Sequence, residues 1–128
     1  QDYRPSEQKA SDAVAEILLG LRRDPVYGVT LTLGLGGVTA EVLADTVTLV
    51  LPVTPDEILA AMRGLQLWPL PDGYRGRPKA DMAAVAEAAV GLGRMMLDRP
   101  EIEEIEINPI LVRRTGLVAV DALIRKVE

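Results

Sequence analysis

Residues 105–121 have the sequence IEINPILVRRTGLVAVD, which begins with alternating apolar and acidic side chains. This alternation continues to Asn108 and is typical of a β-strand with one buried face. Residues 113–116, Arg-Arg-Thr-Gly, are typical of a turn. The stretch 105–120 therefore predicts a β-hairpin.

The turn determines which residues of the hairpin face each other. If Arg113 pairs with Gly116, Asn108 lies directly opposite Asp121. Directly opposed residues share a face of the sheet, with Cβ atoms about 4.5–5.5 Å apart. An amide oxygen and a carboxylate so placed suit Mg²⁺ bridged to nucleotide phosphates. A bulge at Gly116 would shift this register, and the simpler interpretation is a turn at Asn108-Pro109 with Asp121 as a strand-end cap.

Shorter apolar runs predict further strands upstream of the hairpin. They cover residues 13–21, 29–33, 38–43 and 46–53. The Asp24-Pro25 pair favours a turn after the first run. The glycines of the sequence Gly-Leu-Gly-Gly that follows Leu33 are expected to break the second.

Two helices are expected between the last of these strands and the hairpin. Thr54 fits the N-cap of the first helix, and Glu57 three residues later completes a capping box. Gly64 is expected to end this helix. Residues 65–78 are rich in Pro and Gly and predict a long loop. The second helix, 81–98, contains two glycines at 91 and 93, which suggest close packing against another element.

With 128 residues, the chain is long enough for one domain of ordinary size. We expect a flexible lead-in over residues 1–12 and one α+β domain over 13–128, with a largely antiparallel sheet and two main helices. The chain does not begin with Met, so we expect it to be part of a longer protein.

Composition excludes several classes of function. The formal net charge is −5, which argues against a nucleic-acid binder, since phosphate binding needs clustered Lys and Arg. The chain contains no Cys and no His, so it holds no disulfide, thiolate nucleophile, imidazole base or phosphohistidine of its own. It has neither an apolar spanning segment nor a signal peptide, so we expect a cytoplasmic protein without membrane contact.

Three other segments are candidates for binding, and each has a simpler interpretation. The glycines at 34, 36 and 37 could bring backbone amides onto an oxyanion, or form a tight turn between strands. The glutamates at 101–106 most often belong to a solvated face, but Glu106 shares a face with Asn108. The loop 73–78 carries two arginines that could bind phosphate or an acidic partner, or lie in a plain surface loop.

An ordered series of motifs runs through most of the chain. It comprises EILLG (16–20), RDPVYG (23–28), GLGG (34–37), EVL (41–43), GYRG (73–76), EINP (106–109) and VD (120–121). The series resembles the C-terminal half of the ATP-grasp domain in NDP-forming acyl-CoA synthetases, the family of ADP-forming acetyl-CoA synthetase. The beta subunit of succinyl-CoA synthetase is a more distant relative. The resemblance covers roughly residues 13–126, and the order of the motifs makes it specific.

The resemblance implies a ligase that makes an acyl-CoA from a carboxylic acid, CoA and a nucleoside triphosphate, or runs in reverse. The phosphoryl group passes through a histidine that shuttles between active sites. Asn108 and Asp121 are thereby implied as Mg²⁺ ligands. Glu106 would lie beside the phosphohistidine when it docks.

The resemblance also implies a nucleotide, ATP or another triphosphate, on this chain. Gly34, Gly36 and Gly37 would approach the transferred phosphoryl group, and Glu16 and Arg23 fall in motifs near the nucleotide. CoA and the histidine would be bound by other parts of the enzyme. The implied partners are the remaining ATP-grasp half and a CoA-binding domain or subunit, and an oligomer is possible.

The chain departs from the family pattern in two ways. Tyr27 and Val29 stand where the family usually has Phe and Pro, which are changes of modest size. The sequence also lacks the other half of the ATP-grasp domain, so we expect the isolated chain to be inactive. One alternative is a synthetase-like regulatory module of a protein lysine acetyltransferase, and another is a non-catalytic scaffold lobe.

Overall fold

The structure, a computed structural model, describes residues 13–36 and 45–127. Its elements are β1 (Ala15–Asp24), β2 (Gly28–Leu35), β3 (Thr46–Val50), α3 (Pro55–Met62), the 3-10 helix η1 (Tyr74–Gly76), α4 (Met82–Asp98), β4 (Ile102–Val112), β5 (Leu117–Ala119) and β6 (Ala122–Lys126). The strands form one six-stranded sheet in the order β3-β2-β1-β4-β5, and β6 also pairs with β4. Every strand pairing is antiparallel, which confirms the expected α+β fold with two main helices.

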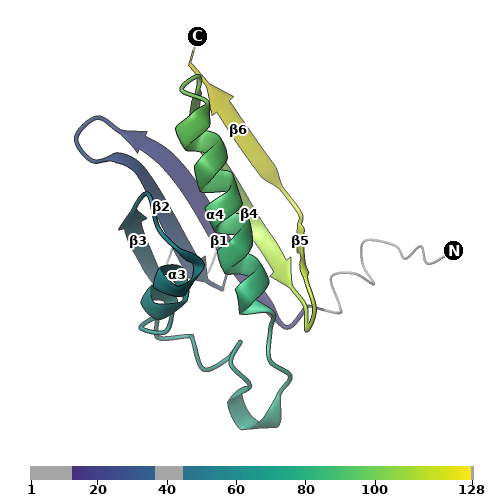
Figure 1. The fold of residues 1–128 in the computed structure, drawn as a ribbon. Coiled ribbons are helices and arrows are strands. Elements are labelled where there is room, and N and C mark those ends of the chain that lie inside the picture. Colours follow the sequence, from purple (N-terminus) through teal and green to yellow (C-terminus); the bar gives the residue numbers. More distant parts are fainter. Residues whose placement is uncertain (1–12, 37–44, 128) are drawn as a thin grey trace, which may run out of the picture.

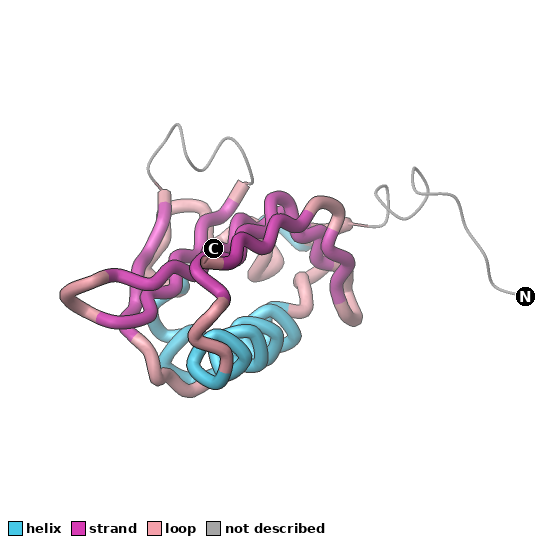
Figure 2. Tube along the Cα trace, turned by 90° about the horizontal axis from the view of Figure 1, so that it is seen from above, coloured by secondary structure: helices cyan, strands magenta, loops and turns pink. Residues whose placement is uncertain are grey.

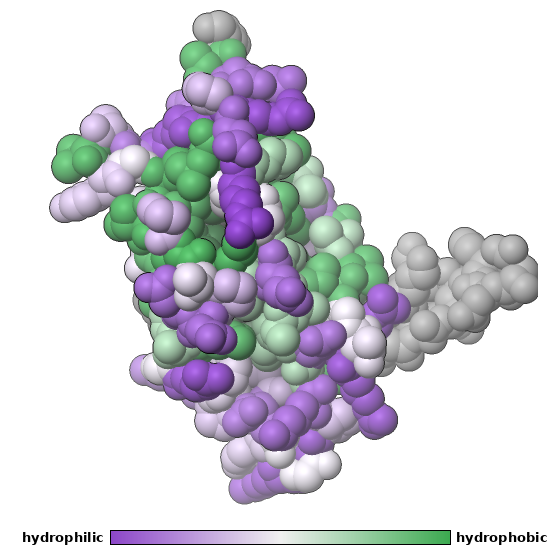
Figure 3. All heavy atoms as spheres, viewed as in Figure 1, coloured by the Kyte–Doolittle hydropathy of each residue, from purple (hydrophilic) through white to green (hydrophobic). Residues whose placement is uncertain are grey.

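Both main helices lie on the same side of the sheet. Figure 1 shows α4 crossing in front of the central strands, and Figure 2 shows α3 and α4 together below them. On this helix side the outer surface mixes charged, polar and apolar residues (Figure 3). We call the opposite side of the sheet, which carries Leu18, Gly20 and Arg22 of β1, the open face.

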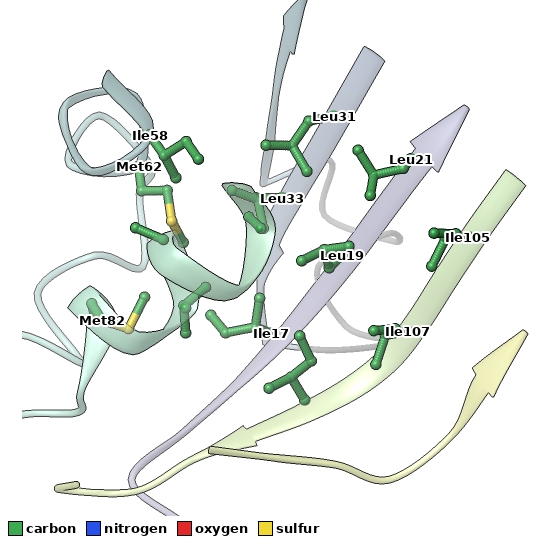
Figure 4. Close-up of a cluster of buried hydrophobic side chains, with 14 of the residues drawn as sticks. Ile17, Leu19, Leu21, Leu31, Leu33, Ile58, Met62, Met82, Ile105 and Ile107 are labelled. Atoms are coloured by element: carbon green, nitrogen blue, oxygen red, sulfur yellow. The ribbon is translucent and has the colours of Figure 1, made fainter. Parts of the chain in front are cut away.

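The hydrophobic core lies between the sheet and the helices. Leu19, Leu33 and Ile105 of the sheet belong to one buried cluster, together with Ile58 and Met62 of α3 (Figure 4). All five side chains are at most 1% exposed. Burying one such side chain stabilises the fold by about 1.5–3 kcal/mol relative to leaving it exposed. The core therefore fixes which face of each strand remains available for a site.

The start of α3 follows the predicted capping box. The Thr54 side chain accepts a hydrogen bond from the Glu57 N–H at 3.2 Å, and the Glu57 carboxylate accepts one from the Thr54 N–H at 2.8 Å. The helix ends at Met62 with Arg63 as its C-cap, before the expected stop at Gly64.

The start of α4 is tied to the hairpin turn through Asp81. Its Oδ1 accepts from the Ala84 N–H at 3.2 Å, and its Oδ2 accepts from the Gly116 N–H at 2.7 Å. The expected close packing occurs at Gly93, where an added Cβ would lie 2.8 Å from Cδ1 of Leu51. At Gly91 the described residues leave open space within 4 Å.

Several strand limits differ from the predictions. β1 continues to Asp24, whose carboxylate accepts the N–H groups of Val26 and Tyr27 in the predicted turn. The run 46–53 gives a strand only as far as Val50. The expected strand 38–43 and the lead-in 1–12 lie outside the described residues. Within the part of the chain that the structure describes, no helix is long and apolar enough to cross a membrane.

Candidate functional site

The polar candidates lie on the open face because strand alternation separates them from the core. A row of register partners crosses the middle of this face. From β3 to β6 it contains Thr48, Thr32, Gly20, Glu106 and Leu123. The face is therefore lined by small and polar side chains near its centre, which suits contact with a polar ligand.

The hairpin register agrees with the prediction from the turn. The Arg113 N–H donates to the Gly116 carbonyl at 3.0 Å, and Gly116 has a positive φ of 78° that favours glycine. The Asn108 N–H donates to the Asp121 carbonyl at 3.1 Å. Asn108 and Asp121 therefore face each other, although the strand opposite β4 is divided into β5 and β6 at this point.

A cleft of about 310 Å³ lies beside this pair and is lined by Glu106, Asn108, Asp121, Ala122 and Leu123. Oδ1 of Asn108 is buried and accepts no hydrogen bond from the described residues. An unsatisfied buried acceptor costs about 1–3 kcal/mol, so it is suited to a cation or an outside donor.

The donor set fits Mg²⁺ better than a metal held by protein alone. No group of three or more His, Cys, Asp or Glu residues gathers around a common point in the described ranges. The pair supplies one amide oxygen and one exposed carboxylate, Asp121. Mg²⁺ is commonly bound through one or two protein oxygens, with phosphate oxygens and waters completing the octahedron.

A β-bulge in β4 aims the site residues. Where β1 has the single residue Leu18, β4 has two, Asn108 and Pro109. Bulges redirect side chains and are frequent beside active sites. Because of the extra residue, Ile107 before the bulge and Ile110 after it both point into the core.

Glu106 lies one residue pair from Asn108 on the same face, opposite Gly20 and Leu123. Its side chain lines both the 310 Å³ cleft and a hollow of about 150 Å³ over β1. The neighbouring carboxylate of Glu104 forms an ion pair with Arg125 at 2.6 Å, so it is not simply solvated.

The glycine segment differs from its prediction. Gly34 does not break the second strand but lies within β2, paired with Leu18 and Thr46. The chain leaves the sheet at Gly36, whose φ is +91° and whose N–H donates to the Glu16 carbonyl at 2.8 Å. Gly37 lies outside the described residues.

Glu16 is exposed at the start of β1 and lines a second cleft, of about 400 Å³, at the edge of the sheet. Gly36, Leu70 and Arg77 are among its other lining residues. The loop 73–78 thus contributes Arg77 to this cleft, whereas the Arg75 guanidinium stacks over the Tyr74 ring at 5.1 Å.

The structure does not bring Arg23 to these groups, and its expected place near the nucleotide stays a prediction. Arg23 lies near the far end of β1 from Glu16, and its guanidinium donates to the carbonyls of Met96, Arg99 and Ile102. A cation there satisfies the free carbonyls at the end of α4 and complements the helix dipole. Arg23 thus joins α4 to β4 and serves the fold.

Sequence reasoning missed the roles of two residues. Asp45 is 6% exposed, and its carboxylate accepts the N–H groups of Gln66 and Leu67, which fastens the loop after α3 to the sheet. A lone Asp after an apolar run gives no signal of this. Gly20 lines the hollow beside Glu106, and its place inside the apolar run 13–21 was a usable signal.

A family model described as an ATP-grasp domain matches residues 6–125. The chain is 37% identical over 107 residues to the beta subunit of an ADP-forming acetate–CoA ligase from Pyrococcus furiosus, covering 84% of this chain and 46% of that protein. It is 39% identical over 122 residues to a trans-feruloyl-CoA synthase from an unknown prokaryotic organism. This match covers 91% of this chain and 17% of that protein.

A solved acetyl-coenzyme A synthetase from Candidatus Korarchaeum cryptofilum has the same fold, with a TM-score of 0.82 and 32% identity. The match covers 88% of this chain and 53% of that one. That structure is a complex with coenzyme A and Mg-AMPPCP, with its phosphohistidine segment pointing towards the nucleotide binding site. The chain thus spans about half the length of these relatives or less. It belongs to the ATP-grasp family and is homologous to the ADP-forming acyl-CoA synthetases.

Proposed function

We propose that this chain forms the metal and phosphate side of the nucleotide site in an ADP-forming acyl-CoA synthetase and is inactive alone. The observation that carries the proposal is the convergence of Asn108, Asp121 and Glu106 on one cleft. The Mg-AMPPCP and coenzyme A in the solved relative support a nucleotide, Mg²⁺ and CoA in the whole enzyme.

In this proposal Oδ1 of Asn108 and the carboxylate of Asp121 hold Mg²⁺ against the phosphates. When bound, the cation neutralises charge on the phosphoryl group that is transferred. The two residues are held by backbone pairing between β4 and the segment before β6, so their separation does not depend on a mobile loop. Such fixed placement favours electrostatic stabilisation without reorganisation.

The cleft beside Glu16 gives the nucleotide a second point of contact. Glu16 pairs with Leu111, three residues along β4 from Asn108, which is about 10 Å of strand. The cleft is lined by apolar residues such as Leu70 together with two charged ones, Glu16 and Arg77. This mixture suits the base and ribose of a nucleotide whose phosphates lie at Asn108 and Asp121.

Glu106 is proposed to act on a histidine supplied by another domain or subunit. A carboxylate that only lined the phosphate pocket would repel the phosphates. Hydrogen-bonded to an imidazole N–H, it would orient the ring and stabilise its positive charge. Since the chain contains no His, the imidazole must come from outside it.

The test of the metal assignment is replacement of each ligand in the complete enzyme. We expect Asp121→Ala to abolish acyl-CoA formation and Asn108→Ala to reduce it severely, because each loses charge stabilisation worth several kcal/mol. Titration of nucleotide with and without Mg²⁺ should show that the Mg²⁺-dependent part of the affinity is lost. Thermal unfolding should be little changed.

Asp98→Ala is the matched control, because Asp98 is an exposed carboxylate at the end of α4. It should leave both the activity and the Mg²⁺ dependence unchanged. Normal kinetics of Asp121→Ala at saturating Mg²⁺ would show that the assignment is wrong.

A further inference from the structure

Gly20 occupies a position where a glycine gives the sheet no benefit. It lies in the middle of β1, a strand of 10 residues, and is paired with Thr32 on one side and Glu106 on the other. A glycine inside a strand weakens it, because the chain loses more conformational freedom and has no side chain to pack. Some other feature of the molecule should account for it.

The usual reasons for a strand glycine are absent at Gly20 within the described chain. Its φ is not among the positive values, which occur at other glycines. The register is regular at Gly20 and its neighbours Leu19 and Leu21. The bulge in β4 lies opposite Leu18, two residues before Gly20. No described atom lies within 4 Å of the place where its Cβ would be. Neither a turn, a bulge nor internal crowding requires glycine here.

The missing side chain leaves a hollow on the open face. The hollow measures about 150 Å³, and its lining includes Leu18, Gly20, Thr32 and Glu106. Arg125 engages Glu104, and no ion pair is formed by Glu106 with the described residues. In this hollow, the backbone of Gly20 therefore lies beside the Glu106 carboxylate, which is available to a partner.

We propose that Gly20 is a positioning residue that keeps the open face clear for the histidine-bearing segment of the enzyme, so that its imidazole reaches Glu106. This rests on the proposed function. The segment must come from outside the chain, which has no His, and in the solved relative a phosphohistidine segment points towards the nucleotide binding site. A strand glycine often marks close approach of another backbone or a ligand.

The charged residues that line the hollow, and the space that Gly20 leaves, indicate which group can occupy it. A side chain on Gly20 would stand between Thr32 and Glu106, the two partners that flank it across the sheet. The charged residues of the lining are Arg22, Glu104 and Glu106. Because Glu104 pairs with Arg125, Glu106 is the carboxylate that can accept from a cationic or N–H-donating ring. The segment thus docks beside the nucleotide, and Gly20 affects transfer to the histidine without contacting the nucleotide.

The test is a series of increasing side-chain size, Gly20→Ala, Gly20→Val and Gly20→Leu, in the complete enzyme. The readout is a single-turnover burst with labelled ATP, in which the β–γ P–O bond breaks, an N–P bond to histidine forms and ADP leaves. We expect the burst rate to fall with side-chain size, by about 10²-fold for Gly20→Leu, since displacement of about 1 Å has that effect. Nucleotide affinity and its Mg²⁺ dependence should be unchanged, and the unfolding midpoint unchanged or raised.

Gly91→Leu is the matched control, because it makes the same substitution at an exposed glycine of α4, on the helix side of the sheet, with no described atom within 4 Å of the added Cβ. It should leave the burst rate unchanged. Gly20→Ala and Gly20→Val with wild-type burst rates would overturn the proposal, and so would parallel loss of nucleotide affinity, which would assign the hollow to the nucleotide. Failure of the proposed function would instead appear as Mg²⁺-dependent affinity that survives Asp121→Ala.

Discussion

Glu106 distinguishes phosphoryl shuttling from simple nucleotide binding. Glu106→Gln keeps the size and hydrogen-bonding shape of the side chain but removes its charge. If the carboxylate stabilises a cationic imidazole, the variant should retain nucleotide affinity and slow phosphorylation of the histidine by about 10²-fold. The measurement is the labelled-ATP burst in the complete enzyme beside a nucleotide titration.

The control for loss of charge is Glu101→Gln, because Glu101 is exposed and lies just before β4. It should leave both the burst and the affinity as in wild type. Collapse of the affinity of Glu106→Gln, with an unchanged burst rate per bound nucleotide, would make Glu106 a nucleotide-binding residue.

Single residues also show where sequence reasoning reached its limit. Asn108 and Asp121 could be paired from the sequence because a short turn sets their register. The contacts of Arg23 could not be predicted, because its partners Met96 and Ile102 are more than 70 positions away in the chain. Side-chain bonds to distant carbonyls leave no periodic pattern. Whether Asn108 and Asp121 bind metal stays a prediction.

The two glycines of α4 give a prediction for the helix that does not depend on function. Gly91 is exposed with open space around it, whereas Gly93 is buried against Leu51. Gly91→Ala should raise the free energy of unfolding by about 0.5–1 kcal/mol through helix propensity. Gly93→Ala should give no gain or a loss, because Leu51 must move and overpacking costs about 1–3 kcal/mol. Chemical denaturation measures both changes.

A double-mutant cycle identifies the cause of the difference. Shortening Leu51 to Ala removes the atom 2.8 Å from the added Cβ, so Gly93→Ala should become stabilising in the Leu51→Ala background. Equal gains from Gly91→Ala and Gly93→Ala in the wild-type background would contradict the packing argument.

Helices were easier to locate from the sequence than strand ends. The capping box at Thr54 and Glu57 is a local signal, and the structure confirms it with two hydrogen bonds. Gly34 favours a break when taken alone, but ladders to β1 and β3 hold it in β2. Pairing between strands overrides local propensity, so a single sequence does not show where β2 ends or where the strand opposite β4 divides.

The arrangement of the whole molecule explains why the chain should need partners. Its helices cover one side of the sheet, and the candidate residues lie on the other (Figures 1 and 2). Phosphoryl transfer depends on placing charge in a site from which water is excluded, and the described residues alone do not cover this face. In the proposed function, this chain would therefore supply ligands for a nucleotide without enclosing it.

We accordingly expect the purified chain to fold but to show no ATP hydrolysis and no acyl-CoA formation. Its buried core supports folding, whereas turnover by the proposed mechanism requires a histidine, which the sequence lacks, and a second surface over the open face. The measurements are thermal unfolding, ADP release and acyl-CoA formation, with the Asp121→Ala chain as the background for contaminating enzymes. ADP release above that background would show that the open face is catalytic by itself. Turnover that appears only when the remaining ATP-grasp half and the histidine-bearing part are added would locate the missing groups outside this chain.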